Sequence, residues 1–355
     1  MEPYFKTTAI DLSYQHHEDG YGLIFIRGND AEKFLQGQLT SDIRQITPTK
    51  YGLSAYCNLK GRVRALLTIF LHDKGYYLLC PHRILSNTLS TLKKYARFSK
   101  VELNDVSSKW DVMGIHIQPI NPHTTKEILC NHLLEQNHFK DIFVSPEKKE
   151  LFSAPRLSCP QPDLRVLALP DPYARFLILG SEHLTEKLRK RLNAYIVAST
   201  DAKEECNQHH FYDKGTFEDW KLLNIKAGIP EIYPETVEKF LPHSLNLPDL
   251  KAVSFDKGCY CGQEVIARMQ YRATLKKHMY RATLEKDLML PLPGTPLIAS
   301  DSEEEAGTLI MVSRSASKIE MLIEAQDVYT NAPNSLFLVQ EGKKIPLVIE
   351  EKCIL

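Results

Sequence analysis

The sequence has no apolar run long enough to cross a membrane and no excess of charge of either sign. A membrane-spanning helix needs roughly 18 to 20 consecutive apolar residues, and no segment of the 355 residues approaches that length. Residues 1–20 also lack the basic start and apolar centre of a secretory signal. Lysine plus arginine and aspartate plus glutamate both number 44, so the formal net charge is zero. We expect a soluble cytoplasmic protein whose surface as a whole does not attract polyanions.

Motifs that mark common cofactor sites are also missing. Neither GxGxxG nor GxxxxGK[ST] occurs, so the sequence supports neither a Rossmann dinucleotide site nor a P-loop, and no HExxH stands out. Of the eight cysteines, only Cys259 and Cys261 lie close together, and a structural zinc site usually needs a second such pair. The sequence therefore predicts no metal site, and scattered cysteines in a reducing cytosol do not predict a disulfide framework.

The apolar pattern of the first part of the chain alternates between the periods of strands and helices. This order favours ferredoxin-like α+β units over a doubly wound parallel sheet. The expected elements are a strand over 21–27, a helix over 29–43 with Asn29 as N-cap, strands over 51–57 and 62–70 joined by a turn at 58–61, a strand over 75–80 and a helix over 83–97. Strand-like runs return at 164–170 and 174–180, followed by a helix after Ser181.

The sequence pattern changes near residue 276. From there to the end, six short strand-like segments are separated by Pro, Gly and acidic turns, without a helical pattern. Such a series predicts a small β-barrel. We therefore expect an α+β region over 1–275, made of two units that meet near 110–120, and a C-terminal β-barrel over 276–355.

The segment Asp256–Val265, DKGCYCGQEV, is the most suggestive for chemistry. Between 257 and 281 there are six Lys or Arg residues and one acid, Glu264, which gives five net positive charges. Nearby cations favour the thiolate of a cysteine, so Cys259 could be a reactive thiol on a tight turn before a helix. It could equally be an inert buried thiol under a solvated basic face, which is the commoner case. Contact with RNA through this stretch is a third interpretation.

Other segments suggest a binding pocket. Trp220 lies in a predicted helix that stops at Gly228, and it could form a wall for a flat aromatic ligand or belong to the core. The amides of Gln36 and Asn58 could line a polar pocket, or they could simply be exposed on the surface. Without further information, the residues indicate a multi-domain α+β protein with a candidate thiol and a candidate pocket for a planar ligand.

Five segments together resemble the YgfZ family, the folate-binding branch of the superfamily that includes the T protein of the glycine cleavage system. They are FLQGQLTSD (34–42), LKKYARFSK (92–100), DWKLLNIKAGIP (219–230), FLPHSLNLPDL (240–250) and SFDKGCYCGQEVIARMQYR (254–272). The resemblance implies two intertwined ferredoxin-like subdomains around a tetrahydrofolate cavity, closed by a C-terminal β-barrel. It also implies an accessory role in the assembly or repair of iron–sulfur clusters, which affects enzymes that modify tRNA.

The resemblance assigns roles to individual residues. Cys259 matches the motif cysteine and is the expected functional thiol, and Lys257 beside it is expected to take part in the same chemistry. Tyr21 and Trp220 match positions where aromatic rings stack on folate. The other residues expected to bind the folate are Gln36, Asn58, Tyr260, Gln263 and Glu264. The implied partners are iron–sulfur proteins or cluster-assembly factors, with contact to tRNA indirect rather than direct. The alternative is a folate-dependent aminomethyltransferase of the T-protein type.

Two positions depart from the family pattern. Lys226 stands in IKAG, where relatives commonly carry a glutamate in IEAG. A carboxylate can accept paired hydrogen bonds from a pterin and an ammonium cannot, so the sequence questions the affinity for folate. Cys261 occupies a position that the motif leaves variable, and its role does not transfer.

Overall fold

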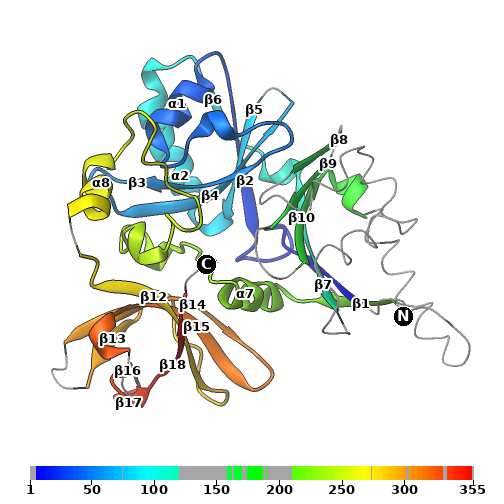
Figure 1. Cartoon of the computed structure of the whole chain (residues 1–355). Coiled ribbons are helices and arrows are strands. Elements are labelled where there is room, and N and C mark those ends of the chain that lie inside the picture. Colours follow the sequence, from blue (N-terminus) through cyan, green and yellow to red (C-terminus); the bar gives the residue numbers. More distant parts are fainter. Residues whose placement is uncertain are drawn as a thin grey trace, which may run out of the picture.

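The computed structural model describes residues 5–73, 75–119, 158–161, 164–169, 174–186, 190, 210–272, 274–300, 304–330 and 334–353. Three β-sheets, of five, six and seven strands, surround a central helix (Figure 1). No helix in this described part of the chain has the length and apolar character needed to span a membrane.

The five-stranded sheet contains the elements predicted for the first part of the chain. Its strand order is β3-β4-β5-β2-β6, and every neighbouring pair is antiparallel. The strands are β2 (Tyr21–Arg27), β3 (Gly52–Cys57), β4 (Val63–His72), β5 (Gly75–Pro81) and β6 (Glu102–Asp105), with helices α1 (Ala31–Gln38) and α2 (His82–Tyr95). The predicted turn at 58–61 is confirmed, since the Gly61 N–H donates to the Asn58 carbonyl at 2.9 Å.

Three details differ from the sequence prediction. Helix α1 ends at Gln38 rather than at 43, because Leu39 is extended. The N-cap of α1 is Asp30 rather than Asn29, and its side chain does not cap the helix because its Oδ2 accepts the Lys100 N–H at 2.7 Å. Strand β6 was not predicted, because it has only four residues and most of them are polar.

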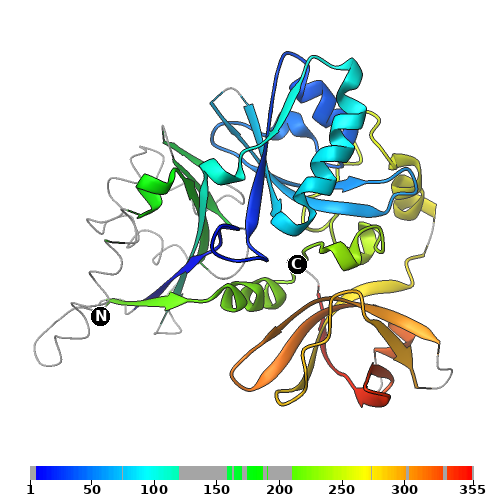
Figure 2. The same cartoon turned by 180° about the vertical axis from the view of Figure 1, so that it is seen from behind.

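Period-two alternation decides which side chains of β2 face which layer. Ile24 and Ile26 pack with the buried residues of α1 and α2. Tyr21 and Leu23 point the other way, toward the second sheet and the central helix. In Figure 2, which shows the molecule from behind, α2 lies in front of this sheet. The side of the sheet that carries Tyr21 is therefore the inner one.

The six-stranded sheet has the order β11-β1-β7-β10-β9-β8, with β1 parallel to β11 and all other pairs antiparallel. Its strands are β1 (Phe5–Asp11), β7 (Asp111–Pro119), β8 (Ser158–Gln161), β9 (Leu164–Ala168), β10 (Ala174–Gly180) and β11 (His210–Gly215). The chain starts in this sheet, forms the five-stranded sheet and then returns, so the two units are intertwined. Their ferredoxin-like arrangement stays a prediction. Of the helix expected after Ser181, only 182–186 and 190 are described.

The seven-stranded sheet is curled. Its order is β17-β16-β13-β14-β15-β12-β18, and its strands are β12 (Lys277–Glu285), β13 (Pro296–Ala299), β14 (Glu305–Arg314), β15 (Lys318–Gln326), β16 (Leu336–Gln340), β17 (Lys343–Pro346) and β18 (Val348–Lys352). Only Leu347 separates β17 from β18 although they are the two edge strands, so the sheet must curl to bring its edges together (Figure 1). The last predicted strand is thus divided in two.

Helix α7 (Phe217–Lys226) is the central helix and contacts β14 and β15 of the curled sheet and β1 of the six-stranded sheet. It begins at a capping box formed by Thr216 and Asp219 and ends before Gly228, which has φ +65° and confirms the predicted stop. Among the described residues, α8 (Gln263–Arg272) forms a further helix. The 3₁₀ turns are η1 (Ile43–Gln45), η2 (Ala96–Phe98), η3 (Ser107–Lys109), η4 (Pro234–Thr236), η5 (His243–Leu245) and η6 (Asp327–Tyr329).

Candidate functional site

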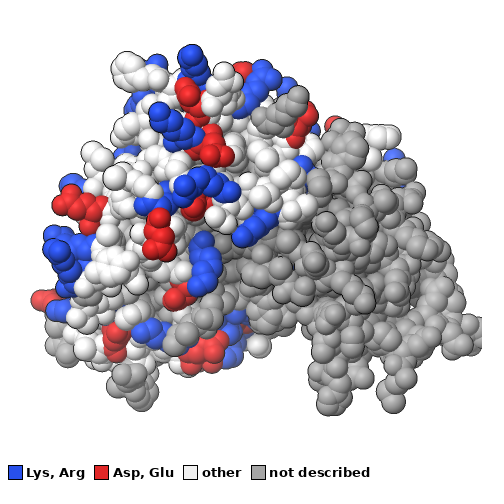
Figure 3. Space-filling model, turned by 45° about the horizontal axis from the view of Figure 1, so that its top comes forward, with Lys and Arg blue, Asp and Glu red and all other residues white. Residues whose placement is uncertain are grey.

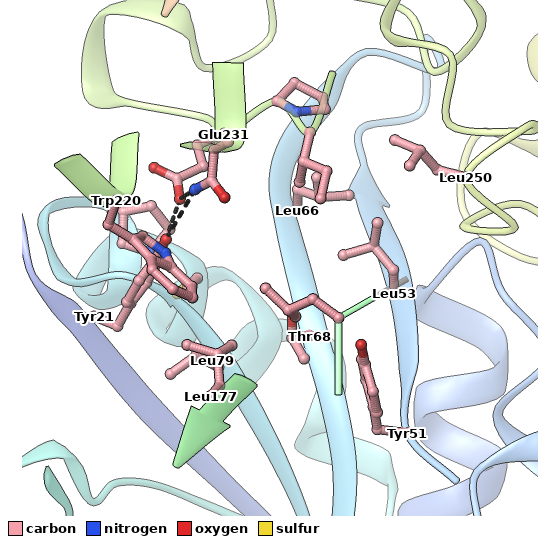
Figure 4. A pocket seen from close by; sticks show the side chains of 16 residues that line it. Tyr21, Tyr51, Leu53, Leu66, Thr68, Leu79, Leu177, Trp220, Glu231 and Leu250 are labelled. Carbon is pink, nitrogen blue, oxygen red and sulfur yellow. Dashed lines mark hydrogen bonds between the residues drawn. The ribbon is translucent and has the colours of Figure 1, made fainter. Parts of the chain in front are cut away.

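A central cavity lies where the inner side of the five-stranded sheet meets α7 and the loop that follows it. It holds about 680 Å³ of space between atoms, counting the part that opens to solvent. Most of its lining is apolar. The lining residues are Tyr21, Tyr51, Leu53, Leu66, Thr68, Leu79, Cys80, Pro81, Leu169, Leu177, Trp220, Asn224, Ile229, Pro230, Glu231 and Leu250. Tyr21, Trp220 and Glu231 meet at one end, and Tyr51 and Leu53 border the other (Figure 4).

One buried carboxylate, that of Glu231, forms the polar end of the cavity. Its Oε1 accepts hydrogen bonds from the Tyr21 hydroxyl and, at 3.0 Å, from Asn224 Nδ2. Its Oε2 accepts from the Tyr233 hydroxyl at 2.7 Å. Burial raises the pKa of Glu231, and the hydrogen bonds from the two tyrosines oppose that rise by stabilising the charged form. The cavity thus offers a fixed acceptor pair in apolar surroundings.

Arg175, fully buried on β10, contacts Asn224 and Trp220 at this polar end of the cavity. Its Nη1 donates to Asn224 Oδ1 at 2.7 Å, which turns the amide nitrogen of Asn224 toward Glu231. Its guanidinium carbon also lies 4.9 Å from the centroid of the Trp220 ring, a distance at which a cation and an aromatic face attract each other. Arg175 therefore fixes both the amide and the aromatic wall.

The helical periodicity of α7 explains which of its side chains reach the cavity. Trp220 and Asn224 are four residues apart and so share one face of the helix. Lys226 is two residues beyond Asn224 and points to the opposite side, where its Nζ lies 3.7 Å from Glu320 Oε1 on β15. Lys226 is not among the lining residues. The carboxylate that does line the cavity is that of Glu231.

The structure thus brings together two residues that the sequence predicted, Tyr21 and Trp220, with two that it did not, Asn224 and Glu231. A signal for Glu231 exists in the sequence, since an acid stands alone in the apolar stretch Ala227–Tyr233 directly after the helix stop. An acid among apolar residues is expected to be buried with hydrogen-bonding partners or to be functional.

The other predicted site residues form a second group, outside the cavity lining. Lys257 is buried, and its ammonium donates to the carbonyls of Gln36, Leu39 and Ser41 at 2.7, 2.7 and 2.8 Å. These carbonyls end or follow α1, so the lysine caps that helix. Burial lowers the pKa of Lys257 to about 8, whereas the three carbonyl acceptors favour the ammonium. Lys257 thus anchors the segment Asp256–Val265, which carries Cys259, to the five-stranded unit. A chemical role for Lys257 stays a prediction.

Replacing Lys257 by methionine should destabilise the protein by about 2–4 kcal/mol, because buried carbonyls would lose their partners. Urea unfolding measures this change. The matched control is Lys226→Met, whose partly exposed ammonium makes only an ion pair near the surface, and which should cost about 1 kcal/mol or less. Equal stabilities of the two variants would contradict the capping role of Lys257.

Cys259 is exposed, in contrast to the buried thiol that the residues alone favoured, and Gly258 beside it has open space around it. Cys261 is half-buried, its N–H donates to the Gly37 carbonyl at 3.1 Å, and burial raises the pKa of its thiol. Gly262 has φ +81° and packs so closely on the 58–61 turn that a side chain would not fit. The segment therefore presents one thiol to solvent and buries the other against the fold.

The remaining predicted residues support this segment or lie beside it. Gln36 bridges α1 to η1, with Nε2 donating to Asp42 Oδ1 at 2.9 Å and Oε1 accepting the Ile43 N–H at 2.8 Å. Asn58 Oδ1 accepts N–H groups within its own turn. Tyr260 is buried, and its hydroxyl has no hydrogen-bond partner among the described residues. Gln263 and Glu264 begin α8.

The six cations between 257 and 281 do not act as one patch. The ammonium of Lys257 donates hydrogen bonds to backbone carbonyls. Lys277 lies 3.7 Å from Glu324 on β15, and Arg281 pairs with Glu320 and Glu351. Three of the six cations are therefore buried or paired with an acid.

Comparisons with known proteins agree with this architecture. No family model matches the chain. The chain is 33% identical over 258 residues to the tRNA-modifying protein YgfZ of Buchnera aphidicola subsp. Schizaphis graminum, which covers 73% of this chain and 69% of that protein. It is 30% identical over 346 residues to the tRNA-modifying protein YgfZ of Escherichia coli O157:H7, with 94% of this chain and 93% of that protein covered.

Among solved structures, the fold is similar to that of the glycine cleavage system aminomethyltransferase T from Bartonella henselae. The TM-score is 0.65, the sequence identity is 13%, and the match covers 98% of this chain and 85% of that chain. At this identity the likeness concerns the fold alone. The sequence identity to the two YgfZ proteins shows the family as well: this chain belongs to the family of the tRNA-modifying protein YgfZ.

Proposed function

We propose that this protein binds a reduced folate in its central cavity and acts as an accessory factor for iron–sulfur enzymes that modify tRNA. Membership of the YgfZ family supports a role in tRNA modification. The observation that carries the folate part is the pairing of Tyr21 and Trp220 with the buried carboxylate of Glu231 in one otherwise apolar cavity.

The chemistry of the cavity suits a pterin. A pterin is flat and carries an amino group beside a ring N–H, and a carboxylate can accept both hydrogen bonds side by side. Glu231 is the carboxylate at this end of the cavity, and a pterin would share its oxygens with the donors of Tyr21, Asn224 and Tyr233. The rings of Tyr21 and Trp220 border it. The remaining apolar lining suits the aminobenzoyl ring of a folate.

Cys259 supplies the chemistry of the accessory role in this proposal. Its thiol is exposed and is not part of the cavity lining. The group on which it acts therefore comes from outside, as an iron–sulfur protein or a cluster-assembly factor. Folate and thiol occupy two separate places on the same five-stranded unit.

The alternative is aminomethyl transfer to folate, which needs a carboxylate for proton transfer near the reacting nitrogens. Glu231 is the one carboxylate among the described lining residues, and three side chains already hold it. It would have to bind the pterin and transfer protons at a distant nitrogen, which favours the accessory role. Release of methylenetetrahydrofolate and ammonia from a lipoyl-bound substrate by the purified protein would support the alternative.

Complementation tests the proposed role in the cell. The chain is expressed in a bacterial strain that lacks its own YgfZ, and thiomethylated nucleosides in total tRNA are quantified by mass spectrometry. We expect the chain to restore thiomethylation. Levels equal to those of the empty vector, with the protein present in soluble form, would contradict the proposal.

A further inference from the structure

Residues 93–100, KKYARFSK, form an exposed segment that the proposed function does not use. We call it the 93–100 segment; it comprises the end of α2, the turn η2 and the residues before β6. It contains four cations and no acid, and all four cations are exposed: Lys93, Lys94, Arg97 and Lys100. A stretch of this length therefore presents four positive charges to solvent.

These charges are not neutralised by neighbours. No ion pair joins any of the four side chains to another residue of the described part of the chain, whereas Arg27, Arg64 and Lys318 each pair with an acid. Asp30 hydrogen-bonds to the segment, but its carboxylate accepts the backbone N–H of Lys100 and not the ammonium. Figure 3 brings the top of Figure 1 forward and shows Lys and Arg side chains over this face, with acidic side chains between them.

Two aromatic side chains accompany the cations. Phe98 is 99% exposed, and Tyr95 is 44% exposed. A phenylalanine with its whole ring in water contributes nothing to the core, and its flat face is free to stack on a planar partner. The alternation of cations and exposed rings is the combination with which proteins hold single-stranded nucleic acid, where cations bind phosphates and rings stack on bases.

We infer that the 93–100 segment is a docking surface for RNA with an unpaired loop, such as tRNA, in which Lys93, Lys94 and Arg97 bind phosphates and Phe98 stacks on an unstacked base. The inference rests on the proposed function, because that function makes tRNA the relevant RNA. It departs from the sequence-based expectation of indirect contact and moves the surface away from residues 257–281. Unpaired loops rather than duplexes fit, because only there are base faces accessible to a ring.

Fluorescence anisotropy with a labelled tRNA transcript tests this surface. The full-length protein should bind with an affinity that falls steeply as KCl rises from about 50 mM, since each phosphate contact contributes about −0.7 to the log–log slope. The double variant Lys94→Glu/Arg97→Glu should bind at least about tenfold more weakly, with a slope less steep by about 1.4. Phe98→Ala should weaken binding about fivefold or more without changing the slope.

The control carries the same change of charge on the curled sheet, Lys286→Glu/Lys343→Glu, two exposed lysines far along the chain, and it should bind tRNA like the wild type. Equal affinity of the two double variants, or failure of the wild type to bind at about 50 mM KCl, would overturn the inference. So would loss of binding to an iron–sulfur protein with unchanged tRNA affinity, since that result assigns the face to a protein partner. Folate affinity, measured on the same variants, should not change, which separates this inference from the proposed function.

Discussion

Replacing Glu231 by glutamine should weaken the binding of tetrahydrofolate by about 10- to 100-fold while leaving the fold intact. A hydrogen bond to a charged acceptor is worth about 1.5–3 kcal/mol when its partner is buried, and tenfold in affinity corresponds to about 1.4 kcal/mol. Glutamine keeps one oxygen but presents an NH₂ group where the second acceptor stood, so it opposes a donor on the pterin. Isothermal titration calorimetry measures the change.

The stability of the same variant relative to the wild type should rise with pH, because the wild type loses stability as its buried carboxylate ionises. Burial raises the pKa of Glu231 above its ordinary value of about 4.5. An acid with a raised folded pKa contributes fully below its unfolded value, and that contribution is lost as pH rises through the folded value. Thermal melts of both proteins should therefore show the difference in stability shifting in favour of Glu231→Gln from about pH 4.5 toward neutral pH.

Lys226→Met is the matched control for folate binding. Lys226 is on the same helix as Trp220 and Asn224 but faces Glu320 of the curled sheet. We expect its affinity for tetrahydrofolate to stay within about twofold of the wild type, because the change removes no cavity contact. If Lys226→Met weakened folate binding as much as Glu231→Gln, Glu231 would not be the group that recognises the pterin.

Replacing Cys259 by serine should reduce tRNA thiomethylation in the complemented strain to the level of the empty vector. Serine has nearly the same shape, and Cys259 is exposed, so the fold should not change. The hydroxyl cannot form a thiolate, which is the form that acts as nucleophile or metal ligand. Nucleoside mass spectrometry, with immunoblots for protein level, measures the effect.

Cys261→Ser is the control for this experiment. Cys261 is half-buried, and its backbone N–H rather than its thiol makes the contact with α1. We expect this variant to keep most of the thiomethylation. A Cys259→Ser protein that restores thiomethylation fully would exclude the thiol from the function, and loss of activity in both variants would point to a role for the pair.

The course of the secondary structure could be predicted where apolar periodicity was strong. The turn at 58–61, the stop at Gly228 and most strands of the first and last units follow from local signals. Strands β1, β6, β7, β8 and β11 were not predicted. Strand β6 is short and polar, and β1 is held by β7 and β11 only through pairing across long stretches of chain. Pairing across long stretches of chain is not encoded locally.

The candidate site was predictable only in part, for a similar reason. Tyr21 and Trp220 could be named from their family positions, but the partner carboxylate was sought at 226, within the matching motif. The structure shows that helical rotation turns Lys226 toward β15, while the loop after Gly228 carries Glu231 back to Tyr21. A local pattern cannot reveal a contact between residues 21 and 231, which depends on how the sheet and α7 pack.

The proposed function places a reduced folate between Tyr21, Trp220 and Glu231. The chain has two tryptophans, so Trp110→Phe leaves Trp220 as the single indole reporter, in contact with the cavity. Titration of this variant with tetrahydrofolate should change its fluorescence in a saturable way with one equivalent bound, and the change should require about tenfold or more ligand when Glu231→Gln is added. A fluorescence that stays constant, with no heat of binding in calorimetry, would contradict the binding of a reduced folate in this cavity.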